Sequence, residues 1–77
     1  MVDEEQQQVR AELVSRLFAL LTSKFEDGAA LAAQCQGARP AEELTSGAER
    51  LRDIAQEGSM VAEAIVELVR SSGAGVQ

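Results

Sequence analysis

Histidine, tryptophan and tyrosine are absent from this 77-residue chain, which holds two phenylalanines, one proline and one cysteine. The single cysteine, Cys35, excludes a disulfide within the chain, and the lack of histidine excludes the common zinc ligand sets. No serine, threonine or cysteine has a histidine to act as its base, and no glycine-rich phosphate loop occurs. We therefore expect no enzyme, no metal site and no cofactor.

Basic side chains are also scarce, since 7 lysines and arginines stand against 13 acidic residues and the net charge is −6. Nucleic acids and anionic membranes are bound by clustered basic residues, so neither is expected as a partner. A small acidic protein of this charge is typical of soluble domains. The missing aromatic residues also remove the platforms on which bases stack.

Long apolar runs are missing as well. The longest, Leu17–Leu21, is too short to cross a bilayer, and the acidic residues 1–5 do not resemble a signal peptide. Together with the one unpaired cysteine, these features predict a cytoplasmic protein.

Two apolar stripes are present, one on each side of Pro40. Their members follow each other in alternating steps of three and four, which is the spacing of one face of an α-helix. No run alternates as a β-strand would. The pattern predicts an all-α fold, an antiparallel helical hairpin that forms one small domain over residues 1–77. The stripes are Ala11, Val14, Phe18, Leu21, Phe25, Gly28, Ala32 and Cys35, then Leu44, Ala48, Leu51, Ala55, Gly58, Ala62, Ile65 and Val69.

The first helix is predicted over about residues 3–36, with Asp3 as its capping residue. The pair Asp27-Gly28 is a turn signal, but the stripe passes through it without a change of phase. We therefore prefer one continuous helix to a helix that ends near residue 26. Gly37 is expected to cap the end, in a turn over residues 37–39.

The second helix has two candidate starts. Pro40 suits the first turn, which predicts a helix over about residues 40–72. Ser46 and Glu49 form a capping box, which would place a start or a kink near Gly47. The phase of Leu44 favours the earlier start. The glycine-rich tail, residues 73–77, is expected to fray.

Folding the stripes together about Ala38 pairs large side chains with small ones, for example Phe18 with Gly58 and Leu21 with Ala55. Such alternation fills a core at native density. We therefore assign the hairpin core to the larger members of the stripes and the small residues opposite them. They are Val14, Phe18, Leu21, Phe25, Leu51, Ala55, Gly58, Ala62 and Ile65.

A second row of apolar residues lies beside each stripe and would remain exposed on a lone hairpin. Exposed patches of this kind mark interfaces. The simplest closure is a symmetric dimer that forms a four-helix bundle, although a higher oligomer or another protein would cover the same residues. We expect the interface at Leu13, Leu17, Leu20, Leu31, Ile54, Val61 and Leu68.

The arginines offer a weaker alternative. Arg39 and Arg50 lie near the turn, and Arg10 and Arg70 lie near the open end of the hairpin. Duplicated in a dimer, either pair is a candidate site for a small anionic ligand. Two functions follow as expectations. The first is a non-enzymatic helical protein–protein interaction module, such as a regulator, adaptor or chaperone-like subunit, that acts as an oligomer. The alternative is an oligomer that sequesters a phosphorylated or nucleotide ligand between protomers.

Overall fold

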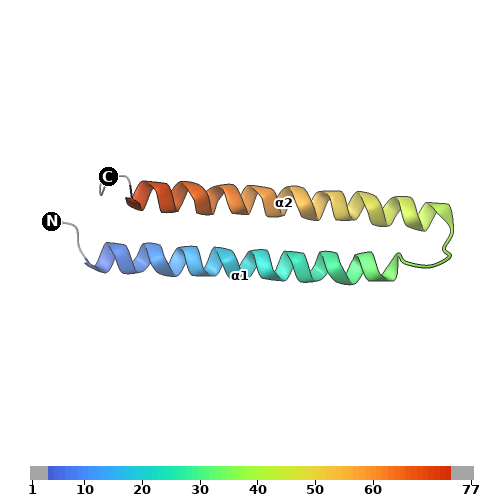
Figure 1. The fold of residues 1–77 in the computed structure, drawn as a ribbon, viewed down its shortest axis with the longest axis horizontal. Helices are drawn as coiled ribbons and strands as arrows, with labels where there is room; N and C mark the ends of the chain where they lie inside the picture. The colour runs from blue at the N-terminus through green and yellow to red at the C-terminus, as the bar shows by residue number, and fades with distance from the viewer. Residues whose placement is uncertain (1–3, 74–77) are drawn as a thin grey trace.

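The computed structural model describes residues 4–73, which form two long antiparallel helices joined by one turn (Figure 1). Helix α1 runs over Glu4–Gln34 and helix α2 over Ala41–Gly73. The described ends of the two helices lie together at the end opposite the turn (Figure 1). The predicted all-α hairpin is therefore confirmed. The expected cap at Asp3 and the tail after Gly73 lie outside the described residues.

Both helices are continuous through their internal glycines. Gly28 lies inside α1, and Gly47 and Gly58 lie inside α2. The amides of Glu43 and Leu44 donate hydrogen bonds to the Pro40 carbonyl, at 3.0 and 3.1 Å, so α2 has its first turn at the proline. The earlier of the two candidate starts is thus the one adopted, and the second candidate, at Ser46, is helix interior.

The turn is made by a glycine in a left-handed conformation. After Gln34, the last residue of α1, the Cys35 amide donates to the Leu31 carbonyl at 3.1 Å and the Gln36 amide donates to the Ala33 carbonyl at 3.2 Å. Gly37 follows with a φ of 99°, a backbone angle that residues with a Cβ rarely adopt. This is the role expected of a glycine after the end of a helix.

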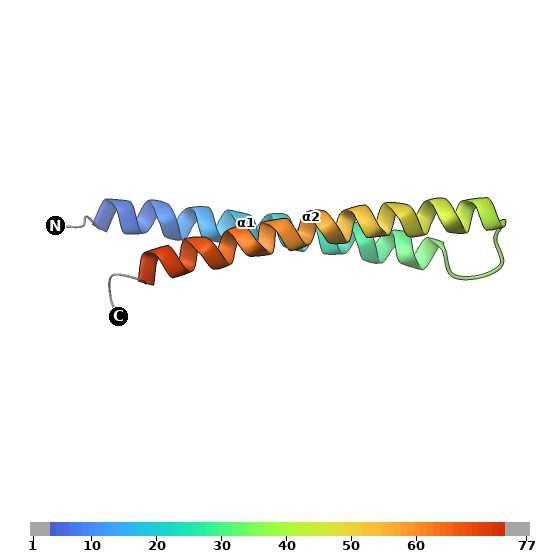
Figure 2. The same cartoon turned by 90° about the horizontal axis from the view of Figure 1, so that it is seen from above.

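The helices meet along a seam whose members are all buried or half-buried. Along each helix the seam residues follow in alternating steps of three and four, so the contact is a heptad seam of the coiled-coil type. The two helices cross at a shallow angle (Figure 2), as such a seam requires. The seam residues are Val14, Leu17, Leu21, Lys24, Gly28, Leu31 and Cys35 of α1, and Gly47, Leu51, Ile54, Gly58, Val61, Ile65 and Leu68 of α2.

Contacts at the glycines define the register. A Cβ on Gly28 would lie 3.6 Å from Ile54 Cγ2, and a Cβ on Gly58 would lie 3.7 Å from Leu21 Cδ2. The predicted pairing of Phe18 with Gly58 is wrong, because the ring beside Gly58 is that of Phe25, with Cε1 at 3.3 Å.

The seam also differs from the predicted core by a rotation of each helix. Phe18 and Phe25 were expected inside, but they are 54% and 60% exposed, and Ala55 is exposed as well. Five residues expected on an outer interface lie in the seam instead: Leu17, Leu31, Ile54, Val61 and Leu68. Val14, Leu21, Leu51, Gly58 and Ile65 lie in the seam, and Ala62 is half-buried at its edge.

The physical reason is the area that each choice buries. The predicted stripe and the observed seam share one row of positions on each helix and differ in the other row. The difference is clearest on α2, where the predicted second row is Ala48, Ala55, Ala62 and Val69, whereas the observed second row supplies Ile54, Val61 and Leu68. Burying a large aliphatic side chain contributes about 1.5–3 kcal/mol, more than alanine can. The hairpin therefore closes on the aliphatic row of α2, and the row of Leu17 and Leu31 on α1 faces it while the two phenylalanines stay outside.

The hairpin has a thin core. Among the described residues the buried large apolar side chains are Leu21, Ile54 and Ile65, at 6–8% exposure. The molecule measures 60 × 17 × 14 Å and has a radius of gyration of 17.6 Å. A compact domain of this length would have a radius of about 11–12 Å.

Candidate interaction surface

The two exposed phenylalanines belong to an uncharged face of the hairpin, which we call the phenylalanine flank. Its members lie beside the seam at heptad spacing, four on each helix. All of them are apolar, and all are exposed or half-buried. The phenylalanine flank consists of Ala11, Phe18, Phe25 and Ala32 of α1, and Ala48, Ala55, Ala62 and Val69 of α2.

The two halves of this flank lie on the same side of the molecule. Two antiparallel helices are related by an approximate two-fold axis that is perpendicular to the plane containing both helices. Rotation about this axis exchanges the helices but keeps each side of that plane in place. The same heptad position on α1 and on α2 therefore lies on the same side of the hairpin. A shallow depression at the open end shows the juxtaposition directly, because Ala11 and Val69 line it together with Val14 and Leu68. Near the middle, the Phe25 ring reaches across to Gly58 of α2. The flank is therefore one surface built from both helices.

The opposite side of the seam, which we call the mixed flank, carries both apolar and charged groups. Leu13 and Leu20, two of the predicted interface residues, lie there at 43% and 42% exposure. Leu13 and Val9 line a second depression at the open end with Leu68. The mixed flank consists of Leu13, Leu20, Asp27 and Gln34 of α1, and Glu43, Arg50, Glu57 and Ala64 of α2.

An ion pair closes the seam on the mixed side. Lys24 occupies a seam position, and its Nζ donates to Glu57 Oε1 at 2.8 Å. This hydrogen bond, together with the charge of Lys24, holds the pKa of Glu57 below its ordinary value of 4.5. Sequence inspection missed the pair, because the phase assigned to the first helix placed Lys24 outside the core. A charged residue in a heptad seam favours one register over its neighbours at some expense in stability.

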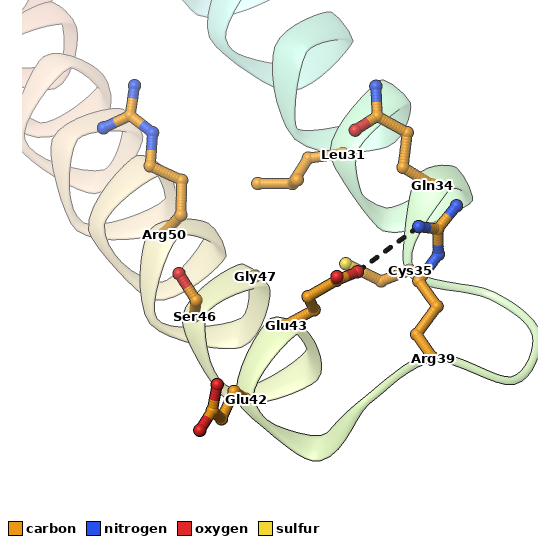
Figure 3. A pocket seen from close by; sticks show the side chains of 9 residues that line it. All are labelled: Leu31, Gln34, Cys35, Arg39, Glu42, Glu43, Ser46, Gly47 and Arg50. Carbon is orange, nitrogen blue, oxygen red and sulfur yellow. Dashed lines mark hydrogen bonds and ion pairs between the residues drawn. The ribbon is translucent and has the colours of Figure 1, made fainter.

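A depression beside the turn contains two of the arginines proposed for an anion site (Figure 3). Arg39 is paired there with Glu43 at 3.5 Å, and the carboxylate of Glu42 lies on the same wall. The Arg50 guanidinium points away from Arg39 (Figure 3). The two arginines are therefore not brought together around a common point, and carboxylates share the depression with them.

The other two candidate arginines are not brought together either. Arg10 is half-buried and lines both depressions at the open end. Arg70 is exposed in the last turn of α2, one turn after Val66 on the outer side of the helix. Within residues 4–73, no group of three or more histidine, cysteine, aspartate or glutamate side chains is placed to hold a metal ion.

Cys35 is half-buried against the second helix. A Cβ added to Gly47 would lie 2.5 Å from Cys35 Sγ, so the thiol occupies the space that this glycine leaves open. The capping box of Ser46 and Glu49 had instead suggested a helix start or a kink near Gly47. Gly47 lies seven residues before Ile54, so the two residues share one face of α2, and this spacing would have placed Gly47 in the seam.

Across the described part of the chain, neither helix is apolar enough over a sufficient length to cross a membrane. Comparison of the chain with models of known protein families, with curated protein sequences and with solved structures finds no match.

Proposed function

We propose that this chain is a non-enzymatic helical interaction module that acts as an oligomer, in the manner of a small regulator, adaptor or chaperone-like subunit. The observation that carries the proposal is the phenylalanine flank, where Phe18 and Phe25 are more than half exposed on an uncharged surface. Apolar patches of this kind on small proteins mark sites of protein contact. Chains of this size commonly gain stability by association, because one thin core contributes little.

The surface area supports the same proposal. The chain exposes 6003 Å², whereas a folded monomer of 8.2 kDa exposes about 4,500 Å². A standard protein–protein interface removes about 800 Å² from each partner. The accessible surface that this chain has beyond that of a compact monomer is therefore large enough to contain a standard interface with one partner.

The alternative function, sequestration of a phosphorylated or nucleotide ligand, has weaker support. Its strongest candidate site is the depression beside the turn, where Glu42 and Glu43 oppose the charge that a phosphate would need. We infer a reducing, cytosolic setting for the module from its single thiol, Cys35.

Light scattering coupled to size-exclusion chromatography tests the proposal. A molar mass of two or more times 8.2 kDa is expected at micromolar concentration. A helical, stable protein that stays at the mass of one chain up to millimolar concentration would overturn it. Thermal shift with a panel of nucleotides tests the alternative, because a ligand at 100 times its Kd adds about 2.7 kcal/mol to the free energy of unfolding.

A further inference from the structure

We propose that a second copy of this chain covers the phenylalanine flank, in a dimer whose two-fold axis runs parallel to the long axis of the hairpin. Both turns then lie at the same end of a four-helix bundle. The inference rests on the proposed self-association and deepens it, because it names the face that is covered and the arrangement of the copies.

The first step is the pairing of bulk across the flank. The contacts of Gly28 with Ile54 and of Gly58 with Leu21 set the register of the two helices. The same register applies along the whole flank. It places Phe18 at the same height along the hairpin as Ala62, and it places Phe25 at the same height as Ala55. At each of these two levels, α1 therefore presents a ring and α2 presents a methyl group.

The second step is the choice of axis. A two-fold axis parallel to the hairpin lays α1 of one copy over α2 of the other at an unchanged level. Phe18 then packs over Ala62 of the partner subunit, and Phe25 packs over Ala55 of the partner subunit. Large side chains meet small ones in every such layer, as dense packing requires.

The competing axis, perpendicular to the hairpin within the interface, fits less well. It lays α1 over α1 and α2 over α2, so the row of α2, which is mostly alanine, meets its own copy wherever the axis lies along the hairpin. The alanine layers would then be left underpacked, and voids of this kind destabilise an interface. The turns would lie at opposite ends of that bundle.

The distribution of charge selects the side on which a second copy can be the occupant. The chain carries a net charge of −6, so two copies repel each other wherever carboxylates would meet. Between residues 8 and 69, the phenylalanine flank and the row outside it on each helix contain one charged side chain, Arg52. The acidic residues of that range lie on the other faces. The phenylalanine flank is thus the side by which like-charged copies can approach.

A partner can also cover the polar group of Thr22 beside the flank without leaving its hydrogen-bond donor unsatisfied. Thr22 lies in the row next to the phenylalanines, and its hydroxyl already donates to the Phe18 carbonyl at 3.1 Å. A donor that is satisfied within its own helix need not keep a water molecule when a partner covers it.

Paired serine substitutions on the two flanks test which face is covered. Phe18→Ser with Phe25→Ser is expected to raise the dimer Kd about a hundredfold or more, since a two-fold axis places each residue in the interface twice. Leu13→Ser with Leu20→Ser, on the mixed flank, is the matched control and is expected to leave the Kd within about threefold. Sedimentation equilibrium measures the Kd of each variant. Circular dichroism at high concentration shows whether each remains helical.

A distance between the two turns tests the axis. Cys35→Ala with Ala38→Cys moves the single thiol to the exposed turn, where a spin label can be attached. The proposed dimer brings the two labels within about two helix diameters, roughly 20–25 Å. The competing axis separates them by most of the 60 Å length of the hairpin.

The outcomes are distinct. A dimer that the phenylalanine variants disrupt, with a short distance between the labels, supports the proposal. A dimer disrupted by the leucine variants instead, or a long distance between labels, overturns this inference and leaves the interaction module standing. A native chain that remains monomeric overturns the proposed function itself.

Discussion

Two glycines of the seam differ in the space that a methyl group would find. At Gly28 an added Cβ would lie 3.6 Å from Ile54 and 3.7 Å from Leu51, which is ordinary contact. At Gly47 it would lie 2.5 Å from Cys35 Sγ, closer than packed atoms approach. Glycine in a helix costs about 1 kcal/mol relative to alanine, so the same substitution should have opposite effects at the two positions.

We predict that Gly28→Ala raises the free energy of unfolding by about 0.5–1 kcal/mol and that Gly47→Ala lowers it by about 1–2 kcal/mol. Urea denaturation followed by circular dichroism measures both. Cys35→Ala added to Gly47→Ala removes the thiol from the contested space and should recover most of the loss. Equal effects at the two glycines would show that Cys35 does not occupy the space beside Gly47.

The pair of Lys24 and Glu57 makes stability depend on pH. Because the hydrogen bond from Lys24 and its charge lower the pKa of Glu57, the ionised carboxylate stabilises the folded state. This contribution is complete at pH values above the ordinary pKa of 4.5 and is lost as the pH falls through the lowered pKa of the folded state.

We therefore predict that Glu57→Gln lowers the Tm at neutral pH and that its difference from the native chain shrinks to nothing in strong acid. Thermal melts from neutral to acidic pH measure the difference. Glu63→Gln, on the outward face of α2, serves as the matched control. If the Tm of Glu57→Gln differed from that of the native chain by a constant amount throughout, the pair would have no role in the acid response.

At the scale of elements, the length of each helix follows from local signals and the junction from one backbone angle. Pro40 begins α2, and Gly37 turns the chain back with a φ of 99°. Heptad phase carried α1 through Gly28, as predicted, and α2 is continuous through Gly47, where the sequence had left a kink open. The pairing of the helices was harder to predict, because the two candidate stripes on each helix share half of their positions.

We predict that Gly37→Ala lowers the free energy of unfolding by about 1–2 kcal/mol, since alanine is strained in the left-handed region. Gly37→Asn should lose less, because asparagine tolerates that conformation. Chemical denaturation of the three proteins gives the order. A Gly37→Ala variant as stable as the native chain would mean that the turn readily adopts another path.

At the scale of the whole molecule, an elongated hairpin with a thin core and a large surface is expected to depend on its partner for stability. The folded state of an obligate dimer is favoured by mass action, so its Tm rises with protein concentration. A monomeric hairpin shows no such dependence.

We predict that each tenfold increase in protein concentration adds about 1.4 kcal/mol to the free energy of unfolding per dimer. Melting curves over three decades of concentration measure the slope. The chain with Phe18→Ser and Phe25→Ser should lose the slope along with the dimer. A native Tm independent of concentration would count against association as the source of stability.

Hydrophobic periodicity alone determined that the chain forms two antiparallel helices, because a spacing of three and four residues is a property of each helix by itself. It also placed a phenylalanine ring beside Gly58, although the ring that lies there is that of Phe25 and not that of Phe18. Which row closes the hairpin was decided only in the tertiary structure. That choice compares the area buried by Ile54, Val61 and Leu68 of α2 with the area buried by the alanines beside them, and it requires both helices at once. The phenylalanine flank is the result, since two large rings remain outside when the aliphatic row is buried.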